Sequence, residues 1–209
     1  DLIAQGDPRI IQFEKVVEGQ NLTPEQREAY VRKCHGFVEY SPPLKAMSRH
    51  PALHAIMEKL IGYQVRLVQD MALLKPPLVG REKPWHQDMA YFDVKPPELV
   101  LGTWTALDPA TPENGCMHVI PGSHQSGPKP HYHDRDCQLS DEDVDVDRDV
   151  MVPLSPGGAL FFGAMLHHGT PPNRSAAGRR AVQFHYCANH CERLSAEEHE
   201  GLFQDAAGY

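Results

Sequence analysis

The chain has 209 residues, a formal charge of −8 and 41% hydrophobic residues, which suits one sizeable core better than two domains. No apolar run is long enough to cross a membrane, and no block of Lys or Arg marks a surface for nucleic acid or lipid. Five cysteines without framework spacing favour a reduced protein. The composition therefore predicts a cytoplasmic protein that binds neither nucleic acid nor membrane, and it carries no signal for an oligomeric state.

Residues 1–62 carry the helix signals. The segment from Thr23 to Gln26 combines a cap hydroxyl, a proline at the first helical position and a glutamine three residues after the cap, which predicts a helix running to about Cys34. A second apolar set recurs at helical spacing before Gly62: Leu53, Ile56, Met57, Leu60 and Ile61. We expect residues 1–62 to form a helical support for the rest of the chain.

After Gly62 the pattern changes to short runs bounded by Pro and Gly, which are typical of strands. These runs are 65–74, the segment around His86, 99–107, 116–120, 150–154, 159–162 and 181–187. Between them, the polar residues 124–147 predict a surface insertion. The tail, residues 192–209, has a capping box at Ser195. We predict one domain, 1–209, mainly β with N-terminal α-helices, whose core at 63–191 is a double-stranded β-helix, a cupin-like jelly roll.

The segment Trp85-His86-Gln87-Asp88 places a histidine and a carboxylate two residues apart. On a β-strand such residues project from one face, where an imidazole nitrogen and a carboxylate oxygen can reach one metal ion. One more ligand would complete the facial triad of two histidines and a carboxylate that holds non-haem Fe(II) and leaves positions open.

A second half of this site follows at residues 157–180, where an apolar strand leads to His167-His168 and then to Gly169-Thr170. One histidine of the pair would point inward and the other outward. The chain then returns with Arg179-Arg180. An arginine inside a barrel must be paired, and a carboxylate cosubstrate is a natural partner because the guanidinium group grips a carboxylate with two hydrogen bonds.

Together these motifs resemble the phytanoyl-CoA dioxygenase family, whose members are Fe(II)- and 2-oxoglutarate-dependent oxygenases with a jelly-roll core. The resemblance covers about residues 71–191. The motifs that carry it are Lys75-Pro76-Pro77, Trp85-His86-Gln87-Asp88 with Tyr91-Phe92, Trp104-Thr105-Ala106-Leu107, Asn114-Gly115-Cys116, Pro121-Gly122-Ser123-His124, His168-Gly169-Thr170 with Asn173, and Arg179.

The resemblance implies that His86, Asp88 and His168 bind Fe(II), with no catalytic group beyond the metal centre. It implies that Arg179, helped by Thr170, binds the distal carboxylate of 2-oxoglutarate. It further implies a cosubstrate pocket lined by Met71, Gln87, Trp104 and Lys33. Gln87 points away from its neighbours on an ideal strand, so its role there requires a twist or a bulge.

The activity that the resemblance implies is a dioxygenase reaction, which uses dioxygen and releases succinate and CO2. The substrate would be hydroxylated at an aliphatic carbon, and it would be a small molecule or an acyl-CoA thioester. Asp88 is present where halogenating relatives carry a small residue, which points to hydroxylation. A CoA thioester would favour basic residues near the mouth, and four flank the His86 segment: Lys75, Arg81, Lys83 and Lys95.

Two other classes of function stay open. One is a cupin-like metalloenzyme that uses the same ligands without 2-oxoglutarate and would not need Arg179. The other is a non-catalytic jelly-roll binding protein. The clusters at 131–137 and 185–191 lack the paired C-x-x-C halves of a structural zinc site. We expect a solvated loop for the first and a strand end for the second, where His185 would face the barrel interior and could contact the substrate.

Overall fold

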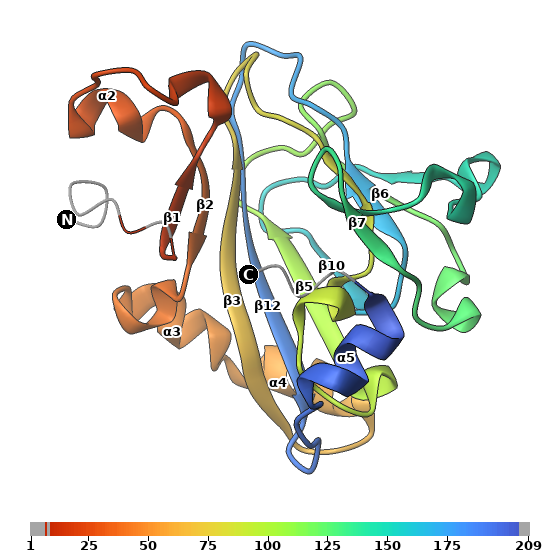
Figure 1. Ribbon diagram of the computed structural model, residues 1–209. Helices are drawn as coiled ribbons and strands as arrows, with labels where there is room; N and C mark the ends of the chain where they lie inside the picture. Colours follow the sequence, from red (N-terminus) through yellow and green to blue (C-terminus); the bar gives the residue numbers. More distant parts are fainter. Residues whose placement is uncertain (1–6, 8, 205–209) are drawn as a thin grey trace.

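Figure 1 shows the fold of the computed structural model, which describes residue 7 and residues 9–204. A six-stranded sheet has the order β1-β2-β3-β12-β5-β10, and a four-stranded sheet has the order β4-β11-β6-β9. A separate hairpin is formed by β7 and β8. All pairs in these sheets are antiparallel. The mainly β jelly roll predicted from the sequence is confirmed.

The strands are β1 (Ile11–Phe13), β2 (Val31–His35), β3 (Val65–Lys75), β4 (Lys83–His86), β5 (Val100–Ala106), β6 (Met117–Val119), β7 (His131–His133), β8 (Cys137–Leu139), β9 (Val150–Val152), β10 (Ala159–Gly163), β11 (His168–Thr170) and β12 (Arg179–Ala188). The helices are α2 (Pro24–Glu28), α3 (Pro42–Ser48), α4 (Pro51–Ile61) and α5 (Ala196–Phe203), with short 3-10 turns between elements. Within the described residues, no helix is long and apolar enough to cross a membrane.

The first predicted helix is shorter than expected. Thr23 caps α2 as its capping box predicts, but the helix ends at Glu28, so its extension to Cys34 is wrong. The chain instead enters β2, where Lys33 lies opposite Leu73 of β3. Pairing with β3 satisfies the backbone of β2 and outweighs a weak local helix preference. The N-terminal part therefore supplies two strands of the larger sheet in addition to helices.

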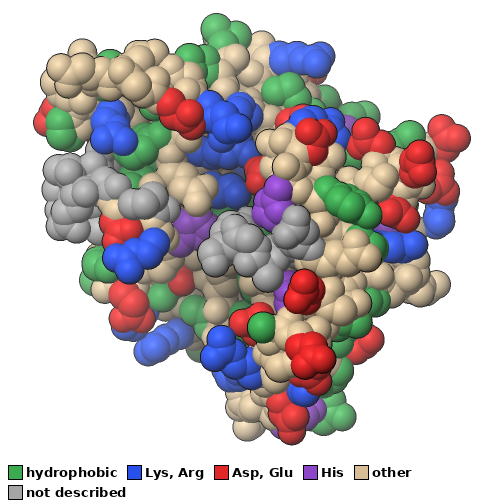
Figure 2. Space-filling model, in the orientation of Figure 1, with side chains coloured by type: hydrophobic (Ala, Val, Ile, Leu, Met, Phe, Trp, Pro, Cys, Tyr) green, Lys and Arg blue, Asp and Glu red, His purple; other side chains and the backbone are tan. Residues whose placement is uncertain are grey.

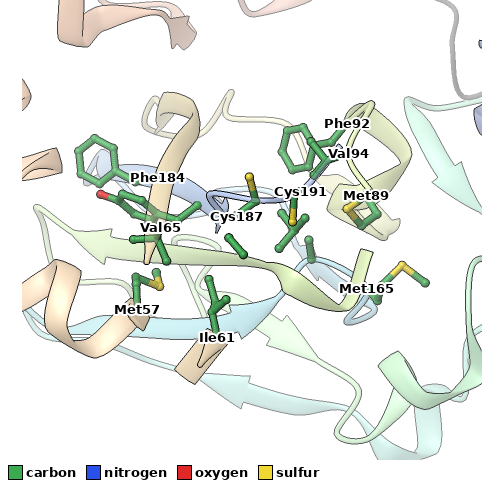
Figure 3. Close-up of a cluster of buried hydrophobic side chains, with 14 of the residues drawn as sticks. Met57, Ile61, Val65, Met89, Phe92, Val94, Met165, Phe184, Cys187 and Cys191 are labelled. Carbon is green, nitrogen blue, oxygen red and sulfur yellow. The ribbon is translucent and has the colours of Figure 1, made fainter. Parts of the chain in front are cut away.

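Helix α4 packs on the larger sheet through Met57 and Ile61, which are buried, whereas Ile56 and Leu60 of the predicted apolar set are exposed. Gly62 ends the helix with a positive φ of 84°. Figure 3 shows Met57 and Ile61 of this helix in the buried cluster that also holds Val65 and Phe184.

Strand β12 divides this hydrophobic core from the interior of the jelly roll. On one side of the strand, Phe184 and Tyr186 are fully buried, and the Tyr186 hydroxyl donates a hydrogen bond to the Ser48 carbonyl at 2.7 Å. Alternate residues of a strand point to opposite faces, so Arg179 and Gln183 face the interior, where both line a cavity.

The segment 124–147 is folded and partly buried, which a polar surface insertion does not suggest. It contains the β7–β8 hairpin, and His131, Cys137 and Leu139 in it are almost fully buried. The His131 Nε2 atom accepts a hydrogen bond from the Gln87 backbone N–H at 3.0 Å. The insertion is therefore attached to the chain directly beside the His86 strand.

Candidate active site

His86, Asp88 and His168 meet inside the jelly roll. His86 ends β4 and lies opposite His168 of β11. The strand predicted to hold both His86 and Asp88 stops at His86, and Asp88 begins a 3-10 turn. Gln87 between them is extended, with φ −109° and ψ 131°, so Asp88 still projects into the interior. All three side chains are buried, and their ligand atoms lie within 4.8 Å of one another.

Backbone carbonyls orient the two imidazoles. The His86 Nδ1 atom lies 2.8 Å from the Pro84 carbonyl oxygen, and the His168 Nδ1 atom lies 2.9 Å from that of Leu166. A carbonyl only accepts, so the proton of each ring lies on Nδ1 and each Nε2 offers a lone pair. Burial, with a further contribution from His168, lowers the pKa of His86 to about 3. Its imidazole is therefore neutral, the form that binds metals.

The Asp88 carboxylate lies between the two rings. Its Oδ1 is 3.4 Å from the His86 Nε2 and its Oδ2 is 3.5 Å from the His168 Nε2. Burial alone would raise the pKa of Asp88, but His168 and His185 hold it well below its ordinary value. Divalent metals bind such atoms at about 2.0–2.2 Å, so ligand atoms at adjacent corners of a coordination sphere lie about 3 Å apart. The residues present therefore fit a divalent ion such as Fe(II).

A cavity of about 800 Å³ opens onto this triad. Five of the six residues that the resemblance assigns to the cosubstrate line it together with the three ligands: Lys33, Met71, Trp104, Thr170 and Arg179. They come from β2, β3, β5, β11 and β12, so both sheets contribute to one cavity.

Arg179 is a buried cation without a counter-ion among the described residues. Its Nη1 lies 3.5 Å from the Leu73 carbonyl oxygen, and its Nε has no partner. The guanidinium carbon lies 5.1 Å from the centre of the Trp104 ring. Burial lowers the pKa of Arg179 to about 10, so it stays charged at neutral pH. Arg180, in contrast, is exposed and binds Asp108 through two 2.8 Å contacts. Of this pair, Arg179 is therefore the one that can receive an anion in the cavity.

Gln87 has a different place from the one that the resemblance implies, because it is fully buried and does not line the cavity. Its amide nitrogen donates to the carbonyls of Gly127 and Met165, both at 2.9 Å. Its amide oxygen accepts from the Lys129 N–H at 2.9 Å. Gln87 thus joins the insertion to the turn before β11.

The cavity wall is rich in cations. Its basic residues are Arg9, Lys15, Arg32, Lys33, Lys75, Arg81, Lys83, Arg135 and Arg179, against three acidic ones, Asp88, Asp134 and Asp136. Figure 2 shows Lys and Arg side chains gathered beside a hollow on this face, with histidines at its edge. Burial lowers the pKa of Lys33 to about 7 and that of Lys75 to about 6. A bound anion would raise both pKa values again.

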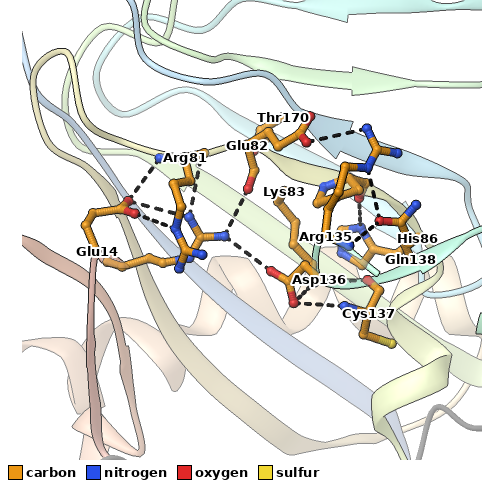
Figure 4. A network of polar contacts seen from close by, with 12 residues as sticks. Glu14, Arg81, Glu82, Lys83, His86, Arg135, Asp136, Cys137, Gln138 and Thr170 are labelled. Atoms are coloured by element: carbon orange, nitrogen blue, oxygen red, sulfur yellow. Dashed lines mark hydrogen bonds and ion pairs between the residues drawn. The ribbon is translucent and has the colours of Figure 1, made fainter. Parts of the chain in front are cut away.

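Several of these cations are held by acidic side chains, as Figure 4 shows. Glu14 binds Arg81 at 2.8 Å and Arg32 at 3.5 Å. Asp136 binds Lys83 at 3.1 Å and Arg32 at 3.3 Å. Because Asp136 lies just before β8, its ion pairs fix the β7–β8 hairpin against β2 and β4 at the edge of the cavity.

Two residues next to the triad are missing from the set that the motifs suggested. The Asp88 Oδ2 atom lies 2.8 Å from the His185 Nε2 and 3.0 Å from the Gln183 Nε2. Both lie an even number of residues from Arg179, and this spacing on a strand could have identified them. His185 does face the interior, as expected, but it does not line the cavity. It lies behind Asp88, where a substrate contact is not supported.

Neither of the other two clusters forms a metal site. His131 is buried and hydrogen bonded instead of lying in a solvated loop. His185 and Cys187 belong to β12, as the strand prediction requires. Among residue 7 and residues 9–204, the triad is the one group of three or more His, Cys, Asp or Glu side chains with metal-binding spacing.

Comparison with known proteins agrees with this geometry. The family model for phytanoyl-CoA dioxygenase (PhyH) matches residues 5–181. Phytanoyl-CoA dioxygenase domain-containing protein 1 of Danio rerio is 31% identical over 194 residues, covering 88% of this chain and 66% of that protein. The peroxisomal phytanoyl-CoA dioxygenase of Rattus norvegicus is 30% identical over 162 residues, 70% of this chain and 46% of that protein. The chain thus spans about two thirds or less of these relatives.

Solved structures share the fold. EvdO2 from Micromonospora carbonacea var. aurantiaca has a TM-score of 0.70 and 29% identity, covering 95% of this chain and 84% of that one. It has also been solved in complex with 2-oxoglutarate. EctD from S. alaskensis, solved with 2-oxoglutarate and 5-hydroxyectoine, has a TM-score of 0.67 and 24% identity over 90% of this chain and 64% of that one; this likeness concerns the fold alone.

Proposed function

Because the chain belongs to the phytanoyl-CoA dioxygenase family of non-haem iron, 2-oxoglutarate-dependent oxygenases, we propose that it is such a dioxygenase and hydroxylates an aliphatic carbon. One observation carries the proposal. A buried triad with the ligands of non-haem iron shares its cavity with a buried arginine that has no counter-ion in the described chain. A non-haem iron site that does not use 2-oxoglutarate needs only the triad, whereas a 2-oxoglutarate oxygenase needs both the triad and the arginine.

In this proposal His86, Asp88 and His168 hold Fe(II). With 2-oxoglutarate and dioxygen, the bound iron supplies the oxidising chemistry, in which one oxygen atom enters the substrate and the other enters succinate as CO2 is released. The protein's own contribution is to fix the ligands and to exclude water. The Pro84 and Leu166 carbonyls set the imidazole tautomers, and burial keeps the His86 ring neutral by lowering its pKa.

Arg179 binds the distal carboxylate of 2-oxoglutarate in this scheme. A buried guanidinium group without a counter-ion is costly, and a dianionic cosubstrate relieves that cost with bidentate hydrogen bonds. Thr170 of β11 lines the same cavity, and Met71 and Trp104 supply apolar walls for the methylene groups. Lys33 of β2 lines the same cavity and in this scheme adds a further charge contact. Gln87 is left out of the cosubstrate contacts because its amide is used elsewhere.

The substrate that the cavity favours is a small molecule with negative charge. Basic side chains outnumber acidic ones on the wall, although the whole chain has a charge of −8. An acyl-CoA thioester fits this description, with its acyl chain toward the triad and its phosphates toward the basic mouth. Of the four lysines and arginines expected near that mouth, Lys75, Arg81 and Lys83 line the cavity, whereas Lys95 pairs with Glu198 on the surface. The five unpaired cysteines support a reducing compartment.

The two other functions predict different behaviour of Arg179. A cupin-like metalloenzyme without 2-oxoglutarate would not need an unpaired cation beside Trp104. A non-catalytic jelly roll would have no reason to keep both imidazole lone pairs directed at a carboxylate. The arrangement of Arg179 and the triad favours the oxygenase over both.

The test is an anaerobic titration of the metal-free protein with Fe(II) and then 2-oxoglutarate, following the weak visible charge-transfer band of the chelate. We expect the band in the wild type and its loss in His168→Ala. In Arg179→Met, 2-oxoglutarate affinity should fall about 100-fold or more, because a buried charge pair is lost. Arg180→Met is the matched control and should stay within about twofold, since surface ion pairs contribute little. Iron binding without the band would favour the cupin-like function, and no iron binding would contradict the proposal.

A further inference from the structure

Two side chains of β12 contact the Asp88 carboxylate. The His185 Nε2 lies 2.8 Å and the Gln183 Nε2 lies 3.0 Å from the same carboxylate oxygen, Oδ2. In the described part of the chain, Oδ1 lies 3.4 Å from the His86 Nε2 and makes no hydrogen bond with another side chain. The two oxygens of the carboxylate are thus in different surroundings, one engaged by the protein and the other free for an ion.

The proton of His185 can be placed from its neighbours. Its Nδ1 is buried and has no partner among the described residues. A proton on Nδ1 would be a buried donor without an acceptor, which is costly, whereas a proton on Nε2 meets a carboxylate at 2.8 Å. His185 therefore donates from Nε2. Gln183 donates to the same oxygen from its amide nitrogen, which explains why the two nitrogens lie 3.2 Å apart.

Gly102 makes room for this contact. It lies opposite His185 in the β5–β12 pairing. A Cβ atom at Gly102 would lie 2.9 Å from the His185 Nε2, a distance that real Cβ atoms essentially never show, and a tight 3.0 Å from the Phe162 Cζ. A side chain at this position would therefore move the imidazole away from Asp88. The backbone at Gly102 has no positive φ, so the glycine is needed for space.

We propose that His185, assisted by Gln183 and accommodated by Gly102, is a positioning residue that holds Asp88 as a one-oxygen ligand of the metal. This inference rests on the proposed function, because it requires that the triad binds iron. Partners behind a metal ligand fix its orientation, and their removal lowers metal affinity by about 10–100-fold. His185 itself touches neither the cavity nor the reacting atoms.

Four single variants and one double variant test this assignment. The single variants are His185→Leu, which removes the donor; His185→Gln, which keeps one; Gly102→Ala; and Gly163→Ala. The double variant is His185→Leu/Gly102→Ala. Gly163 is the matched control, because it lies on the neighbouring strand β10 and a Cβ there would meet nothing within 4 Å. Fe(II) affinity is measured anaerobically by calorimetry on the metal-free proteins. Thermal unfolding of the same samples verifies that each variant is folded.

We expect His185→Leu to weaken Fe(II) binding about 10–100-fold, His185→Gln to recover most of the loss, and Gly163→Ala to match the wild type. Gly102→Ala should also weaken binding, and the double variant His185→Leu/Gly102→Ala should be no weaker than His185→Leu alone, because both changes act on one contact. Additive losses would mean that Gly102→Ala acts through Phe162 and would remove Gly102 from the assignment.

A second readout separates positioning from general stability. At saturating Co(II), the visible absorption bands report the ligand arrangement, and they should differ from the wild type in His185→Leu but not in Gly163→Ala. If the wild type binds Fe(II) while His185→Leu binds it equally well with an unchanged Co(II) spectrum, the inference alone is overturned. If the wild type does not bind Fe(II), the proposed function is overturned as well.

Discussion

Lys33 is a partly buried amine on the cavity wall, and burial, followed by the charge of Lys83, lowers its pKa to about 7. At pH 8 the free protein therefore holds most of this side chain neutral. A dianion bound beside it favours the charged form, so binding of 2-oxoglutarate should take up as much as one proton at this pH. Calorimetry in two buffers with different ionisation enthalpies measures this uptake.

The control for this proton uptake is Lys33→Met. If Lys33 is the source, the variant should bind 2-oxoglutarate more weakly, and its heat of binding should be nearly independent of the buffer. Uptake that persists in Lys33→Met would point to another amine of the wall, such as Lys75, whose pKa burial lowers to about 6.

A substitution of Gln87 distinguishes the stabilising role that its contacts indicate from the cosubstrate-binding role that the family resemblance implies. Gln87→Met removes the side-chain partner of one buried carbonyl, that of Met165, and of a partly buried carbonyl and N–H, those of Gly127 and Lys129. We therefore expect the free energy of unfolding to fall by about 2–4 kcal/mol, measured by urea denaturation. The 2-oxoglutarate affinity of the folded protein should be unchanged. Weaker 2-oxoglutarate binding with unchanged stability would instead support the role that the resemblance assigns to Gln87.

At the scale of elements, the β7–β8 hairpin depends on Asp136. Asp136→Asn removes the charge that faces Lys83 and Arg32, so both cations lose a counter-ion in a partly buried site. We expect a loss of about 1–2 kcal/mol in stability and faster amide hydrogen exchange across His131–His133 and Cys137–Leu139. Asp141→Asn is the matched control, because its ion pair with Arg135 is exposed. Equal exchange in the two variants would show that Asp136 does not hold the hairpin.

The sequence predicts those elements whose signals are local. The capping boxes at Thr23 and Ser195 both form as read, and α4 ends at Gly62. Strand β2 escaped prediction because it follows a genuine helix cap and gains its stability from pairing with β3, a partner about 40 residues away. The same holds for the buried hairpin in 124–147, whose attachment through His131 and Gln87 has no local signature.

In the candidate active site, the motifs correctly identified residues that lie together, but they did not identify the role of each residue. The H-x-D spacing correctly predicts that His86 and Asp88 both point into the jelly-roll interior, although the strand ends between them. Some residues of the family motifs stabilise the backbone. The Asn173 side-chain nitrogen, for example, donates to the carbonyls of Lys75, Pro76 and Ala177. A motif alone does not separate such support from ligand binding, because both constrain the residue type.

At the scale of the whole molecule, two charge patterns oppose each other. The chain as a whole is negative, with a formal charge of −8, whereas basic residues dominate the cavity wall. The net charge of the chain should repel a dianion, whereas the field of the basic cavity wall should attract it. At 0.1 M salt, charged groups more than about 10 Å from the ligand are screened. The sign of the salt dependence therefore reveals which field guides the ligand.

If the cavity field dominates, the association rate of 2-oxoglutarate with the Fe(II)-loaded protein should fall as salt rises from about 20 to 300 mM, because screening weakens attraction. Anaerobic stopped-flow measurement of the charge-transfer band gives this rate. Lys15→Ala removes an exposed charge at the cavity wall and should flatten the slope, while Lys59→Ala, on α4, should not. If net charge dominates, screening relieves repulsion and the rate rises with salt. That result would also weaken the case for an anionic substrate, since a substrate meets the same field.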